Sequence, residues 1–82
     1  MTTTTLAPLT DKQRAIYRYI AKRFVDTRMG VTYRDVQVKF GFGSINGSVT
    51  HVKALHRKGW VELHANQARA ILPSVEALAH DA

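Results

Sequence analysis

Residues 32–59, TYRDVQVKFGFGSINGSVTHVKALHRKG, carry the pattern that decides the fold. Thr32 is a residue type that caps the N-termini of helices. Val36 and Phe40 follow it and lie four apart, so they share one face of a helix. The pattern therefore predicts a short helix over residues 33–40 that buries these two side chains.

A second helix is expected directly after the first. The tight connection at residues 41–44 contains two glycines, and Ser44 or Ile45 opens the helix. The helix extends to about Lys58, and Gly59 stands where glycine commonly ends a helix. Two helices joined by a short turn that contains glycine are typical of a helix-turn-helix.

A longer helix precedes this pair. Thr10 and Gln13 stand three apart in a capping-box pattern, which predicts a helix from about residue 11 to residue 27. Its apolar residues fall on one helical face; they are Ile16, Tyr17, Tyr19, Ile20 and Phe24. Residues 1–8, which come before it, are polar and rich in threonine, and we expect them to form a flexible arm.

The period of the hydrophobic residues changes after Gly59. Residues 60–64 alternate between apolar and polar, as a half-buried strand does. Residues 70–72, just before Pro73, are expected to return as the partner strand. Three helices followed by a small β-hairpin predict a mainly α fold, a winged helix-turn-helix domain over residues 9–73.

The last residues, 74–82, have two interpretations. They can add a short helix with Ser74 as its cap, and Val75 and Leu78, three apart, could then contribute to a dimer. Fraying of this tail is the expectation that the sequence favours.

Composition narrows the classes of function. The 82 residues suffice for one core, and twelve Lys and Arg against six Asp and Glu give a net charge of +6. Such an excess suits nucleic acid, anionic lipid or an acidic protein as partner. The sequence has no cysteine for a disulfide or a thiolate site, and no apolar run that could serve as a membrane span or a secretory signal. We therefore expect a cytoplasmic protein, and the small core argues against an enzyme.

The helix expected over residues 44–58 has two different faces. At 100° per residue, one face gathers an amide, a hydroxyl and two cations within about 60° of each other; its members are Asn46, Val49, Thr50, Lys53 and Arg57. This order suits a recognition helix, because an amide can bond to adenine, a valine can touch a thymine methyl and cations can contact phosphates. The alternative is a solvated surface that binds nothing.

Four blocks of residues, at matching spacing, carry a resemblance to a known family. They are Leu9-Thr10-x-x-Gln13, Met29-x-x-Thr32, Gly41-Phe42-x-Ser44-x-Asn46 and His51-x-Lys53-Ala54-Leu55-x-Arg57-Lys58-Gly59-x-x-Glu62. With these blocks the chain, from Leu9 to about Leu72, resembles the N-terminal DNA-binding domain of the SOS repressor LexA. The last block is the most specific of the four.

The resemblance implies a winged helix that binds operator DNA through its third helix. By match, the residues that contact bases are Ser44, Asn46, Gly47, Val49 and Thr50. A glycine at position 47 would let the helix approach DNA closely. The residues assigned to phosphate contacts are Lys53, Arg57, Lys58 and, in the wing, Arg69.

This sequence departs from the family in two respects. The family usually has acidic residues where Val49 and Thr50 stand, and carboxylates typically accept from cytosine N4. We therefore expect a half-site that differs from the family operator. The family also continues into a self-cleaving domain that dimerises the protein, whereas this chain ends at Ala82. Neither self-cleavage nor that mode of dimerisation is expected here.

The leading hypothesis is a transcriptional regulator, a repressor, that binds specific double-stranded DNA. One small module has a limited interface, which favours a homodimer on a two-fold site. No cofactor, metal or small-molecule substrate is expected, and the four histidines, His51, His56, His64 and His80, lack metal-ligand spacing. One rival is a winged-helix adaptor that binds a larger regulator; the other is non-specific nucleic-acid binding. A compact domain of this kind also fits a phage or mobile element.

Overall fold

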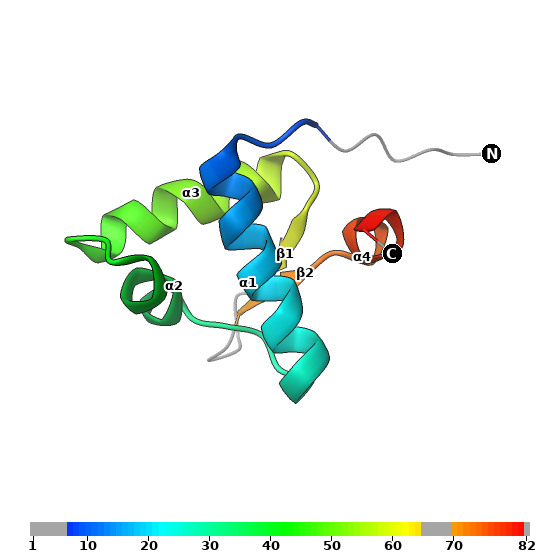
Figure 1. Cartoon of the computed structure of the whole chain (residues 1–82), viewed down its shortest axis with the longest axis horizontal. Helices are drawn as coiled ribbons and strands as arrows, with labels where there is room; N and C mark the ends of the chain where they lie inside the picture. The colour runs from blue at the N-terminus through cyan, green and yellow to red at the C-terminus, as the bar shows by residue number, and fades with distance from the viewer. Residues whose placement is uncertain (1–6, 65–69, 82) are drawn as a thin grey trace.

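The computed structural model describes residues 7–64 and 70–81 of the chain (Figure 1). These residues form, in order, α1 (Asp11–Thr27), α2 (Tyr33–Phe40), α3 (Ile45–Arg57), β1 (Val61–Leu63), β2 (Ile71–Pro73) and α4 (Val75–Asp81). The strands pair antiparallel as a two-stranded sheet. The mainly α fold with one small hairpin that the sequence predicts is therefore confirmed.

Local capping determines where α1 and α2 begin. At α1, the Thr10 hydroxyl accepts from the Gln13 N–H (3.2 Å) and Gln13 Oε1 accepts from the Thr10 N–H (3.1 Å). Thr32 and Asp35 make the same reciprocal pair at α2, at 2.9 and 3.1 Å. Each pair satisfies two backbone N–H groups that a helix start otherwise leaves without partners. Both helices consequently begin at the predicted residues.

The two helices end differently. Gly41 ends α2 in the left-handed region, with φ 68°, where glycine has no steric cost. Arg28 takes the same conformation after α1, with φ 61°, and its N–H donates to the Phe24 carbonyl at 2.7 Å. The left-handed position therefore lies at Arg28, directly after the predicted last residue of the helix, and is not occupied by a glycine.

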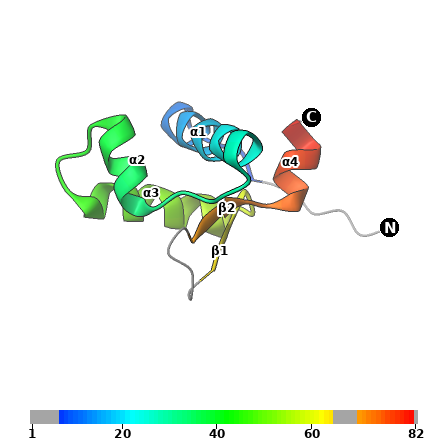
Figure 2. The ribbon, with the colours of Figure 1, turned by 90° about the horizontal axis from the view of Figure 1, so that it is seen from below.

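The core lies between α1, α3 and the hairpin. Figure 2 shows α1 along one side of the domain, with α3 and the hairpin on the other. The contributing side chains with no exposed surface include Ile16, Ile20, Val52, Leu55 and Ile71. Burial of these side chains fixes one face of α3 against the body of the domain and leaves its opposite face to solvent.

The hairpin is tied to the helices by a third short segment. Val61 pairs with Pro73, and Leu63 pairs with Ile71. On its other side, Ile71 exchanges two backbone hydrogen bonds with Val31, at 2.9 and 3.1 Å. The bridge at Val31 anchors the connection between α1 and α2 to the hairpin. The turn of the wing, residues 65–69, lies outside the described residues.

The segment before α1 is hydrogen-bonded to the end of α3. Of the arm expected over residues 1–8, the described residues are Ala7 and Pro8. The Ala7 N–H donates to the Lys58 carbonyl (3.3 Å), and the Trp60 indole Nε1–H donates to the Ala7 carbonyl (2.8 Å). The Lys58 ammonium donates to the Pro8 carbonyl at 2.9 Å. We call these three hydrogen bonds the N-terminal latch.

The residues for which the sequence favours fraying form helix α4. Ser74 caps it, because its hydroxyl oxygen accepts from the Ala77 N–H at 3.0 Å and its O–H donates to the Gly59 carbonyl at 2.8 Å. Ala77 is completely buried and Leu78 packs against the core, which is why the helix is held. Val75 is exposed, whereas Leu78 is half-buried against the core. Figures 1 and 2 place α4 and α2 at opposite ends of the domain.

Candidate nucleic-acid interface

Helix α3 presents a polar face to solvent. Ser48, Val52 and Leu55 are completely buried on one side. The exposed residues on the other side are Ser44, Asn46, Thr50, Lys53 and Arg57, with Val49 half-buried at the edge. The division between a core face and a polar face, which the spacing predicts, is therefore present in the structure.

The first turn of α3 leaves its polar groups available. Ser44 occupies the N-cap position in an extended conformation, but its hydroxyl makes no capping hydrogen bond. Asn46 follows two residues later and is exposed. A hydroxyl and an amide thus stand together at the start of the helix, and both can donate or accept at a base edge.

Gly47 provides room for an aromatic side chain. A Cβ at this position would lie 3.1–3.2 Å from three carbons of the Phe42 side chain. The Phe42 ring also stacks on the His51 ring, with centroids 5.1 Å apart and 17° between planes. The His51 Nδ1–H donates to the Gly47 carbonyl at 2.8 Å. The close approach that the structure contains at Gly47 is therefore with Phe42, which sets the position of the first turns of α3.

Phe42 also connects α3 to the other helices. The Lys12 ammonium lies 5.2 Å from the centre of the Phe42 ring, close enough for a cation–π contact. Phe42 also packs near Phe40, with centroids 6.4 Å apart, and Phe40 meets Tyr19 edge to face at 5.8 Å. Sequence reasoning missed this cluster, because a phenylalanine between two glycines has no periodic pattern that would assign it to a face.

The cations of α3 have two different environments. Lys53 and Arg57 are exposed and have no hydrogen-bond or ion-pair partner within residues 7–64 and 70–81. The Lys58 ammonium instead donates to the Pro8 carbonyl (2.9 Å) and to Gln13 Oε1 (2.7 Å), which leaves one N–H for another acceptor. Arg69, the fourth predicted phosphate contact, lies outside the described residues.

The electrostatics around α3 favour an anion. The sequence has no Asp or Glu between Asp35 and Glu62, so the whole of α3 and the turn before it lack carboxylates. Among the described residues, no carboxylate forms an ion pair with Lys53, Arg57 or Lys58. An exposed helix with cations and no anions attracts a polyanion such as a phosphate backbone.

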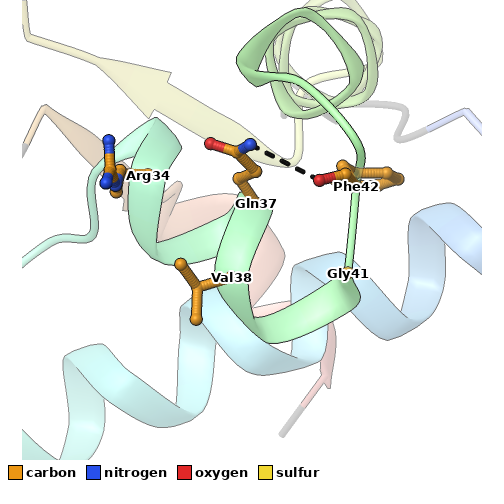
Figure 3. A pocket seen from close by; sticks show the side chains of 5 residues that line it. All are labelled: Arg34, Gln37, Val38, Gly41 and Phe42. Atoms are coloured by element: carbon orange, nitrogen blue, oxygen red, sulfur yellow. Dashed lines mark hydrogen bonds between the residues drawn. The ribbon is translucent and has the colours of Figure 1, made fainter.

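A shallow hollow of about 310 Å³ lies beside this surface on α2. Arg34, Gln37, Val38, Gly41 and Phe42 line it (Figure 3). The Gln37 amide crosses it and donates to the Phe42 carbonyl at 3.4 Å, which supports the turn between the helices. The lining residues include no acid, base or nucleophile that could form a catalytic set.

Residues 7–64 and 70–81 contain neither a metal-ligand cluster nor a helix that could span a membrane. No three His, Cys, Asp or Glu side chains in this part of the chain lie together as a metal site would require. Over the same residues, the helices are too short or too polar to cross a bilayer.

The fold and this surface define the class of protein. A helix-turn-helix made of α2 and α3, followed by a hairpin and exposing a polar, basic α3, is a winged helix-turn-helix of the DNA-binding kind. The chain matches the LexA DNA-binding domain family over residues 6–70 and belongs to that family.

Curated relatives agree with this assignment. The chain is similar to the LexA repressor of Colwellia psychrerythraea (42% identity over 69 residues, covering 84% of this chain and 33% of the relative). The LexA repressor of a Shewanella species is 36% identical, covering 87% of this chain and 35% of the relative. An Anaeromyxobacter LexA repressor is 35% identical, with 84% and 30% covered. The chain thus spans about a third of the length of these relatives.

Proposed function

We propose that this chain binds specific double-stranded DNA and represses transcription, with α3 in the major groove. The observation that carries the proposal is the exposed face of α3, which combines an amide, hydroxyls and two cations without any carboxylate. Neither cation has a partner among residues 7–64 and 70–81. Membership of the LexA DNA-binding domain family and similarity to LexA repressors support the same function.

The proposal gives each part of α3 a separate task. Ser44, Asn46 and Thr50 read base edges, with Val49 beside them, since the residues near the start of a recognition helix reach furthest into the groove. Gly47 belongs to the same base-reading turn, where the absence of a side chain allows close approach to DNA and leaves room for Phe42. The phosphate contacts come from Lys53, Arg57, the remaining N–H of Lys58, and Arg69.

Two copies of the domain bind one operator in this proposal. A single α3 with its wing offers a small contact area, whereas specific repressors commonly place two domains on half-sites one helical turn apart. The chain acts as a binding protein in the cytoplasm, with DNA as its ligand and without catalysis. Exposed Ser44 has no histidine or carboxylate within hydrogen-bond reach in the described residues that could activate it as a nucleophile.

Selection from a random duplex library, at near-physiological salt, tests this function. We expect an enriched motif with two related half-sites. Retention that depends on salt but yields no motif would contradict the proposal and favour a non-specific binder. Absence of retention would favour an adaptor that binds protein, and affinity capture of a partner would then follow.

Substitution of the α3 cations should reduce the salt dependence of binding. We expect Lys53→Ala and Arg57→Ala each to flatten the slope of log K against log salt by about 0.9, because each lost contact releases about one counterion fewer. Affinity should fall to a similar degree on specific and random DNA. Titrations between low and physiological salt give the slope.

Lys22→Ala is the matched control for this prediction. It removes one positive charge from α1, where Lys22 pairs with Asp26 at 3.6 Å and its side chain is 79% exposed. An unchanged slope is expected for this variant. If all three variants change the slope equally, net charge rather than contact explains the binding, and the role of α3 would be wrong.

A further inference from the structure

The first turns of α3 carry an apolar row at the edge of the polar face, between that face and the core. Ile45, the first residue of the helix, is 41% exposed, although isoleucine is among the residues most often buried. Val49 follows four residues later and is half-buried, so the two side chains are neighbours on one row. The core and the apolar residues packed against it include neither of them. Packing within the domain therefore does not explain this row.

The neighbours of the row indicate what covers it. Asn46 and Thr50 stand next to Ile45 and Val49 along the chain, and both are exposed. Lys53 continues the same surface and is exposed as well. Ile45 lies between Ser44 and Asn46 in the first turn of α3, the part of a recognition helix that contacts base edges. The occupant that this position favours is therefore the floor of the major groove.

Only one group in the major groove is apolar. The C5-methyl of thymine is exposed there, whereas guanine, cytosine and adenine present hydrogen-bonding groups. Asn46 also favours an A·T pair, because its amide can form hydrogen bonds with both N6 and N7 of adenine. No carboxylate is available on α3 to accept from cytosine N4.

We infer that Ile45 is a further specificity-determining residue, and that Ile45 and Val49 together read thymine methyl groups. The half-site is accordingly centred on A·T pairs, with Asn46 on an adenine and the apolar row on neighbouring thymines. This inference rests on the proposed function, since it concerns the sequence that α3 selects.

Uracil replacement tests the inference directly, because uracil pairs as thymine does but lacks the methyl. The motif is first selected from a random duplex library that contains thymine. Each thymine of the selected site is then replaced by uracil, one position at a time. We expect about fourfold weaker binding at one or two positions, the effect of leaving one methyl group without apolar contact. Replacements outside the motif should have no effect.

Variants connect each methyl to its residue. The Ile45→Ala variant should bind the thymine and uracil duplexes with equal affinity at one of the sensitive positions. The Val49→Ala variant should do so at the other position. Val49→Thr keeps the volume of the side chain but makes it polar, and should also reduce the difference in affinity between the thymine and uracil duplexes. Val25→Ala removes the same atoms from an exposed valine on α1 (60%) and should leave the difference intact. Circular dichroism melts establish that each variant is folded.

The outcomes separate the inference from the function it rests on. A motif whose affinity is insensitive to uracil at every position overturns the methyl-reading role and leaves sequence-specific binding in place. Sensitivity to uracil that persists in both Ile45→Ala and Val49→Ala assigns the methyl contact elsewhere and also overturns the inference. If the library yields no motif, both the proposed function and this inference fail.

Discussion

Replacing Trp60 by alanine should destabilise the domain by about 3–5 kcal/mol, the usual cost of truncating a large buried aromatic residue. Trp60 is 9% exposed and its ring meets that of Tyr17 edge to face, with centroids 5.1 Å apart. Its indole N–H also closes part of the N-terminal latch, at 2.8 Å from the Ala7 carbonyl. Small domains have total stabilities of about 5–15 kcal/mol, so this variant should lose a large fraction of its free energy of unfolding.

Urea unfolding followed by far-UV circular dichroism measures this loss, since the variant lacks the only tryptophan of the chain. Trp60→Phe is the matched control. It keeps an aromatic ring against Tyr17 but removes the indole N–H, and should cost about 1–2 kcal/mol. If Trp60→Ala proves as stable as Trp60→Phe, the ring contributes little and the hydrogen bond to Ala7 is the principal contribution.

Asn46→Ala should weaken binding to the selected operator by about 1–3 kcal/mol, or roughly fivefold to 150-fold, with little effect on random DNA. The reason is geometric, because the amide is exposed at the start of α3 and can make two hydrogen bonds to one adenine. Competition assays with specific and random duplexes give the two affinities. Stability in urea should stay within about 0.5 kcal/mol of the unmodified chain, as for surface positions generally.

Asn46→Asp distinguishes the loss of the amide hydrogen bonds to a base from the loss of side-chain volume at this position. Aspartate has nearly the same size but accepts hydrogen bonds only, so it cannot donate to adenine N7. We expect it to bind the operator no better than the alanine variant. Equal losses on specific and random DNA for Asn46→Ala would contradict the base-reading role and move Asn46 to the phosphate contacts.

Local patterns in the sequence predict the helices closely. The bounds expected for α1 and α2 match the structure, and α3 ends one residue before the expected Lys58. Capping residues lie within three positions of the groups they satisfy, and apolar residues repeat within one turn. The exposed face of α3 could be predicted for the same reason, since the positions of its residues follow from spacing along one helix.

The remaining features depend on contacts between distant residues. The bridge from Val31 to Ile71 and the hydrogen bond from Trp60 to Ala7 join segments that no short pattern connects. Lys58 illustrates the consequence for the candidate site. Its match to a phosphate-contacting position gives no sign that Pro8 and Gln13 occupy two of its three N–H groups. The sequence likewise favours fraying at residues 74–82, because the stability of α4 comes from packing Ala77 and Leu78 on the distant core.

The N-terminal latch also determines the order in which the chain can assemble during synthesis. Pro8 and Lys58 are 50 residues apart, and Ala7 and Trp60 are 53 apart. At about 5–20 residues per second, the ribosome makes Lys58 roughly 3–10 s after Pro8. The capping box of α1 needs only Thr10 and Gln13 and can form during that delay. The latch therefore closes only after α3 has been synthesised, and its hydrogen bonds are the step that joins the segment before α1 to the end of α3.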